Sequence, residues 1–273
     1  MFASRKYAGI MYYLIEELKS RNETLFWFAV INFALAILFF AFTKFSATVV
    51  AGINAWYKPF KFSLSIGVYA ATMAWYCHYL PSFNIQLFNW TNIFLFSFEI
   101  VYIVIQAARG QESHFNWTAP FYKAMFGGMA IAAIAITIYA AYVGIKFFQT
   151  DFPDLPNYYV WAVRLSIFIF VIFSFEGVLM GGRQTHTIGT EVQNTFLPIF
   201  KWNRKEGDLR VAHFIGMHAL QIIPFLSFYL LKNTKAVFAL SSLYFFFAVF
   251  VLMQALQSKP FIKSKQNQHA AIS

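Results

Sequence analysis

Four of the six histidines in this chain lie in three short polar stretches that also carry arginine, glutamine or acidic residues. The stretches are 109–116, 182–189 and 207–218, and their histidines are His114, His186, His213 and His218. Imidazole is the commonest metal-ligating side chain, and sites that mix histidine with carboxylate suit zinc or non-haem iron. The histidines therefore predict a bound metal ion, Zn or Fe, with these four side chains as candidate ligands.

The spacing of His213 and His218 does not place them on the same face of a helix. His213 and His218 are five residues apart, which is about 140° around an ideal helix. An i, i+4 pair on one face, as in His-Glu-x-x-His zinc proteases, is a different geometry. Both rings reach one site only if the first turn after Asp208 is irregular; otherwise His213 contacts the loop or headgroups and His218 points inward. Asp208 is expected to cap the helix that follows it.

Two glutamates are expected inside the membrane, where an ionisable group costs at least about 2.5–3.5 kcal/mol at a helix centre. Glu99 has Tyr102 and Gln106 at i+3 and i+7, so these three predict a polar stripe facing other helices. Counting along the helices places Glu99, Glu176 and His218 roughly 7–14 Å below the same membrane face. The two glutamates are therefore candidate catalytic groups. The alternative is that they pair with arginines to hold helices together.

Three cations and an amide complete the candidate site. Arg109, Arg183 and Lys61 are expected near the headgroups, where they would hold an anionic group such as a lipid phosphate or carboxylate. Gln221 follows His218 by about one helical turn. These four residues are the candidate substrate-binding residues, and a membrane lipid is the expected partner.

The composition requires these residues to be positioned by membrane-spanning helices. The chain has 273 residues, of which 59% are hydrophobic and only 12% charged, whereas soluble domains carry about 25% charged residues. Its mean hydropathy is +0.56. These values exclude a soluble enzyme, a disordered protein and a nucleic-acid-binding domain. The single cysteine, Cys77, excludes an intrachain disulfide and a cysteine-rich metal site.

Seven charge-poor windows are long enough to span a bilayer, which takes about 20 apolar residues each. They predict an all-α, polytopic bundle of seven transmembrane helices within 23–258, preceded by a short amphipathic N-terminal helix in 1–22. A polar tail is expected over 259–273, and one domain is the natural count. The windows lie near 24–43, 60–80, 87–108, 121–146, 160–181, 212–231 and 236–257.

The net charge of +10 is explained by lysines and arginines that flank the spans, not by nucleic-acid binding. Seven of them fall on the side of the N-terminus and thirteen on the opposite side. The positive-inside rule then predicts the N-terminus outside and the C-terminus inside, in a bacterial inner membrane. The long polar loops, 44–60, 109–120 and 182–211, all fall on the C-terminal side, so we expect the function on that side.

The leading hypothesis is an intramembrane metal-dependent enzyme that acts on a lipid-like or amphiphilic substrate, by hydrolysis or by oxidation at iron. A b-type haem electron-transfer protein is an alternative, which needs axial histidines on facing helices. A proton-coupled transporter is another, although no pair of half-helices or inverted repeat is evident. An oligomer or a subunit of a larger membrane complex is also compatible with the sequence.

Overall fold

The computed structural model describes residues 2–189 and 196–263 of the chain. The polypeptide is mostly helical, as predicted, and divides into two compact units, Met1–Leu155 and Pro156–Ser273. We call them unit 1 and unit 2 and describe each separately. Residues 264–273 of the predicted polar tail lie outside the described residues.

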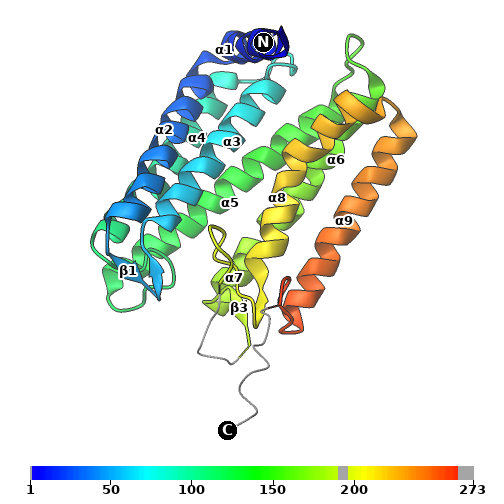
Figure 1. Ribbon diagram of the computed structural model, residues 1–273. Helices are drawn as coiled ribbons and strands as arrows, with labels where there is room; N and C mark the ends of the chain where they lie inside the picture. The colour runs from blue at the N-terminus through cyan, green and yellow to red at the C-terminus, as the bar shows by residue number, and fades with distance from the viewer. Residues whose placement is uncertain (1, 190–195, 264–273) are drawn as a thin grey trace. The chain divides into compact units, whose positions relative to one another are not determined.

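Unit 1 consists of five helices and a small β-hairpin. Helices α2, α3 and α4 run side by side, with α1 at one end and the hairpin at the other (Figure 1). The helices are α1 (Phe2–Arg21), α2 (Glu23–Phe45), α3 (Tyr57–Cys77), α4 (Ile85–Ala108) and α5 (Pro120–Gln149), and the hairpin pairs β1 (Val49–Val50) with β2 (Ile53–Asn54).

The corner between α1 and α2 is fixed by a pair of asparagines. Asn22 caps α2 by accepting a hydrogen bond from the Leu25 amide. Its side chain also exchanges two hydrogen bonds, of 2.9 and 2.8 Å, with the amide of Asn89 on α4. Both amides are buried, and their reciprocal bonding satisfies polar groups that would otherwise be costly there.

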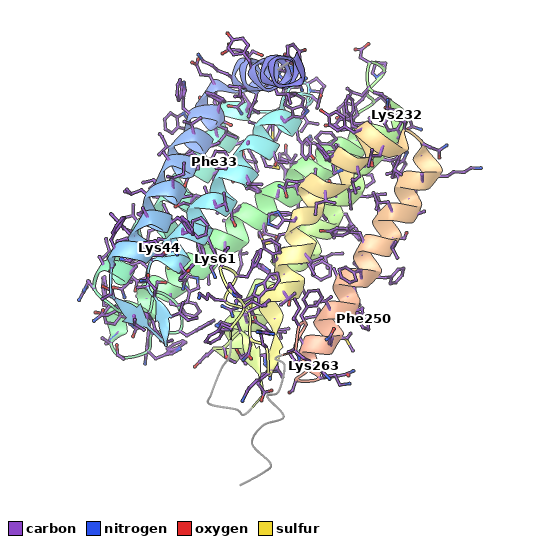
Figure 2. All side chains as sticks on the ribbon, in the orientation of Figure 1. Phe33, Lys44, Lys61, Lys232, Phe250 and Lys263 are labelled. Carbon is purple, nitrogen blue, oxygen red and sulfur yellow. The ribbon has the colours of Figure 1, made fainter. Side chains whose placement is uncertain are left out.

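A glycine allows α2 and α3 to approach closely. A Cβ atom at Gly67 would lie 2.8 Å from Cε1 of Phe33, which is labelled in Figure 2. Small residues at helix interfaces are a general means of close packing in membranes. Cys77, the last residue of α3, is also fully buried in this unit.

Unit 2 has three long helices, α6, α8 and α9, side by side, with the short helix α7 and strand β3 near one end (Figure 1). Lys232 and Lys263 lie at opposite ends of the unit (Figure 2). The elements are α6 (Asn157–Ser174), α7 (Glu176–Arg183), β3 (Thr187–Ile188), β4 (Gly207–Asp208), α8 (Leu209–Leu226), the π-helical turn η1 (Ser227–Leu231) and α9 (Thr234–Leu256).

The core of unit 2 joins its three long helices through buried apolar side chains. Phe173 of α6 packs directly on Gly216 of α8, where a Cβ would lie only 2.0 Å from the Phe173 Cγ. Pro224 lies inside α8, and the helix continues after it as the π-helical turn η1. Proline supplies no N–H for the regular helical pattern, which accounts for the loosened backbone at this end of α8.

Six helical segments within the described ranges are long and apolar enough to cross a membrane. They are Glu23–Phe45, Ile85–Ala108, Pro120–Gln149, Asn157–Arg183, Leu209–Leu231 and Thr234–Leu256. The predicted window at 60–80 corresponds to α3, which is 21 residues long but is not among the six. The class is therefore an all-α membrane protein with six candidate spans.

Candidate functional sites in the two units

The junction of α6 and α7 holds a buried carboxyl group. Helix α6 ends at Ser174, a single residue intervenes, and α7 begins with Glu176. The Glu176 side chain is 6% exposed, and neither carboxylate oxygen has a hydrogen-bond partner among the described residues. A buried polar group without a partner costs about 1–3 kcal/mol, and a charged one costs more. Glu176 therefore has the properties of a group that is held ready for a ligand or a proton.

The imidazole of His213 lies against the same junction. Its Nδ1 is 2.7 Å from the carbonyl oxygen of Phe173, and a Cβ at Gly177 would be 3.7 Å from its Cε1. A carbonyl oxygen only accepts, so Nδ1 donates and carries the proton in the neutral ring. The Nε2 atom is then left with a lone pair, which is the arrangement by which a backbone carbonyl orients metal-ligating or proton-accepting histidines.

His218 occupies a different side of α8. Its Nδ1 is 3.2 Å from Oε1 of Gln221, and its ring packs on Phe214 with centroids 4.3 Å apart. Because α8 is regular from Leu209 onward, the 140° separation from His213 is retained. The expectation that His213 would contact the loop or headgroups was wrong, since packing of α8 on α6 turns this ring inward.

Asp208 is the centre of a charged network at the start of α8. Its side chain caps the helix, as predicted, by accepting from the backbone N–H of Arg210 at 3.1 Å. It also accepts from Nε and Nη2 of Arg210, at 2.9 and 2.6 Å, and from the Asn203 amide at 2.9 Å. Nδ1 of His186 is 3.9 Å away. The Asp208 charge also acts on Glu176, so the network and the unpaired carboxyl are electrostatically linked.

This network changes the pKa of Asp208. Burial alone raises that pKa, but the hydrogen bonds and charge of Arg210, the charge of His186 and the Asn203 amide together hold it below its ordinary value. Arg210 was not among the predicted site residues. Its position two residues after the predicted cap, Asp208, was the feature of the sequence that could have identified it. The ion pair itself was harder to predict, because it depends on the extended backbone of β4.

We expect acid to destabilise the protein through Asp208. A depressed carboxyl pKa contributes stability that is fully present above the unfolded value of about 3.9 and is lost as the pH falls below it, through the lower folded pKa. The melting temperature in detergent, measured between pH 6 and pH 2, should therefore fall more steeply with pH below about pH 4. The Asp208→Asn variant should show a shallower decline over that range, and parallel curves for the two proteins would contradict the assignment.

The remaining predicted residues of unit 2 lie at its periphery. His186 is partly exposed, and its Nδ1 is 3.1 Å from the Thr187 hydroxyl. Arg183 is the exposed last residue of α7, and no hydrogen bond joins it to Glu176. A cation that the sequence analysis missed is Arg164 of α6, which stacks on Trp161 at 5.1 Å. Its position within an apolar window was the signal that could have identified it.

Unit 1 also contains a buried carboxyl group, on α4. Glu99 is 6% exposed, and the charge of Lys58, in the first turn of α3, acts on it. Tyr102 and Gln106 are buried on the same face, as predicted, and Nε2 of Gln106 is 3.2 Å from the Tyr102 hydroxyl. Lys58 was missed because the predicted window began at residue 60, whereas α3 begins at Tyr57.

His114 lies in the loop after α4 among aromatic rings. The centroids of Phe62 and Phe126 are both 5.8 Å from its own. Burial and the nearby charge of Lys58 hold the pKa of His114 well below its ordinary value, so the ring is neutral at pH 7. Lys58 therefore acts on both Glu99 and His114, which links α3, α4 and the loop between α4 and α5.

The two predicted cations of unit 1 differ in exposure. Lys61 is half-buried on α3 (Figure 2). Arg109 is exposed at the end of α4 and donates from Nη2 to the Tyr122 hydroxyl at 3.2 Å. Two further buried amides were missed, Asn32 and Asn92; each donates to the carbonyl four residues earlier, and neither Oδ1 has a hydrogen-bond partner among the described residues. Asn92 precedes Glu99 by seven residues, a spacing that could have identified it.

The predicted metal cluster is not shown. Among residues 2–189 and 196–263, no group of three or more histidine, cysteine, aspartate or glutamate side chains is arranged to hold a metal ion. Glu99 and His114 belong to unit 1, whereas Glu176, His186, His213 and His218 belong to unit 2. Metal binding therefore stays a prediction.

The fold and these sites define a class, a polytopic α-helical membrane protein with a polar centre in each of two helical units. Comparisons with protein families, with curated proteins and with solved structures give no match for this chain.

Proposed function

We propose that α3 is a seventh transmembrane span and that α1 is an amphipathic helix on the membrane surface. The 21 residues of α3 correspond to about 31 Å, the thickness of a bilayer's hydrocarbon core. Its polar side chains include Ser63 and Tyr69, which are buried and so need not meet lipid. With seven spans, charge bias favours a bacterial inner-membrane protein with its N-terminus outside.

We infer that the chain is an intramembrane enzyme whose reaction centre lies in unit 2. The observation that supports this most is the Glu176 carboxyl group, which is buried with both oxygens unpartnered among the described residues, at the helix junction that the ring of His213 contacts. Such a carboxyl group is suited to accept or deliver a proton, or to bind a metal ion. A polar group without a hydrogen-bond partner inside a membrane costs folding free energy, so a functional role is the simplest explanation for Glu176.

In this proposal a metal ion, Zn or Fe, binds near the junction of α6 and α7. Nε2 of His213 and a Glu176 oxygen would be two of its ligands. Catalytic zinc sites use three protein ligands and leave a position open, so a rotation of His186, which belongs to the same unit, would supply the third. The bound ion would polarise the substrate or lower the pKa of a water molecule. Glu176 or a neighbouring group would accept or deliver the proton.

The proposed substrate is lipid-like or amphiphilic. Arg183, exposed at the end of α7, would attract an anionic headgroup, and Gln221 would hold the orientation of His218 through its 3.2 Å contact. Glu99, His114 and Lys61 would form an auxiliary polar centre in unit 1. A b-type haem is less well supported, because His213 and His218 lie on the same helix.

The test is metal content, measured by elemental mass spectrometry after detergent purification without chelators. We expect near-stoichiometric Zn or Fe in the wild-type protein. His213→Ala and Glu176→Gln should each lower the metal affinity at least about tenfold, because even the loss of a residue that only hydrogen-bonds to a ligand typically has this effect. His78→Ala is the matched control, because His78 belongs to unit 1 and is not among the proposed ligands, and it should retain the ion.

Wild-type protein without metal, or His213→Ala with full metal, would contradict the proposal. A second candidate function would then be favoured, proton-coupled transport along the buried face of α4. Asn92, Glu99 and Gln106 follow one another there at intervals of seven residues, all buried. Proton uptake by vesicles containing the purified protein would distinguish this function, and Glu99→Gln should abolish it.

A further inference from the structure

A groove in unit 1 runs along α4 and the beginning of α5. It has a volume of about 480 Å³, and its walls are almost entirely apolar. Phe94, Val101 and Ile105 of α4 form one side, and Phe121 and Met125 of α5 form the other. Since α4 rises about 1.5 Å per residue, the stretch from Phe94 to Arg109 is about 22 Å long. That length exceeds one leaflet of hydrocarbon, which is about 15 Å thick.

One end of this groove carries a positive charge. Among residues 2–189 and 196–263, Arg109 is the only cation that lines it, and it caps the C-terminus of α4, where the helix dipole favours a cation. Nη2 of Arg109 is oriented by the Tyr122 hydroxyl at 3.2 Å, and none of the described carboxylates forms an ion pair with it. Its remaining guanidinium donors are thus available to an anion from outside the protein.

Neighbouring side chains indicate that this end lies at headgroup depth. Trp117 is 42% exposed in the loop between α4 and α5, and the ammonium group of Lys123 lies 5.7 Å from its ring centre. Exposed tryptophan together with lysine is typical of the membrane–water interface. An arginine at this depth meets lipid phosphates, which guanidinium groups bind in a bidentate manner.

We propose that the groove binds an anionic phospholipid of the membrane, with one acyl chain along α4 and the phosphate on Arg109. The apolar walls accept the chain, and the single oriented guanidinium at the headgroup end selects the negative headgroup. The site belongs to unit 1 and does not depend on the enzyme proposed for unit 2.

The experiment is native mass spectrometry of the full chain in detergent, titrated with phosphatidylglycerol or with phosphatidylcholine. We expect the anionic lipid to bind more tightly. Arg109→Ala should weaken phosphatidylglycerol binding roughly tenfold, the effect of one charge-assisted contact, with a smaller change for phosphatidylcholine, whose choline group offsets the phosphate charge. Lys44→Ala is the matched control, because Lys44 is an exposed cation at the end of α2 and does not line the groove (Figure 2). This variant should bind as the wild type does.

A second variant tests the apolar part of the groove. Val101→Trp should fill it and weaken the binding of both lipids, and because Val101 is 57% exposed, the substitution leaves the buried core intact. Equal binding of the two lipids by the wild type would overturn the proposal. So would unchanged phosphatidylglycerol binding in Arg109→Ala or in Val101→Trp. Each readout is independent of metal content and of activity.

Discussion

The Asp208→Ala variant is expected to lose up to about 3–5 kcal/mol of folding free energy, because it removes the buried partner of an ion pair whose arginine is partly buried. The Asp208 side chain is fully buried, and it accepts from Arg210 through two side-chain contacts of 2.6 and 2.9 Å. Its removal also leaves the first amides of α8 without their cap, a change that alone costs about 1 kcal/mol. Reversible unfolding in mixed detergent micelles would measure the loss.

The control for Asp208→Ala is a substitution at a surface acid of the other unit. Glu23→Ala removes a carboxylate from the first turn of α2, where its closest recorded partner is the exposed Trp27 ring N–H at 3.4 Å. We expect a change below about 1 kcal/mol for it. Similar losses in the two variants would show that the Asp208 network has no special importance for stability.

The Gly216→Ala variant is expected to lose at least about 2 kcal/mol, because a well-packed core does not accept an added methyl group without moving. The new Cβ would lie 2.0 Å from Cγ and 2.2 Å from Cβ of Phe173, a side chain that is itself 2% exposed. Phe173 cannot turn aside without displacing the core between α6 and α8. Because its carbonyl orients His213, this variant should also bind less metal if the proposed site is correct.

Gly182→Ala is the matched control for this substitution. Gly182 is also a helical glycine of unit 2, but a Cβ there would meet nothing within 4 Å. We expect its stability to stay within about 1 kcal/mol of the wild type. In a Phe173→Ala background, Gly216→Ala should cost little, since the clashing ring is gone. An undiminished cost in that background would place the strain elsewhere.

The sequence predicted the helices well because long apolar windows leave few alternatives to membrane spans. The predicted window at 121–146 corresponds to the helix Pro120–Gln149, and the one at 236–257 corresponds to Thr234–Leu256. The break at Phe175 within the fifth window was not predicted, since the residues on both sides of it are equally apolar. For α3, polar residues near its start also concealed where the helix begins.

For the candidate sites, the sequence predicted which residues are buried better than it predicted the direction in which their side chains point. Burial of Glu99 and Glu176 follows from their apolar neighbours in the sequence. The inward turn of His213 does not, because it depends on which face of α8 packs on α6. The charge of Lys58 acts on both Glu99 and His114, which lie far from it in the sequence. Such contacts require the packed helices, not only the pattern along each one.

The paired asparagines at the corner of α1 and α2 can meet only late in synthesis of this unit. Asn22 and Asn89 are 67 residues apart, and ribosomes add about 5–20 residues per second. The corner therefore stays open for roughly 3–13 seconds after Asn22 is made, while α2 and α3 are already available to the insertion machinery. During that interval water, or a chaperone, has to satisfy the Asn22 amide, and the corner between α1 and α2 is not yet held against α4.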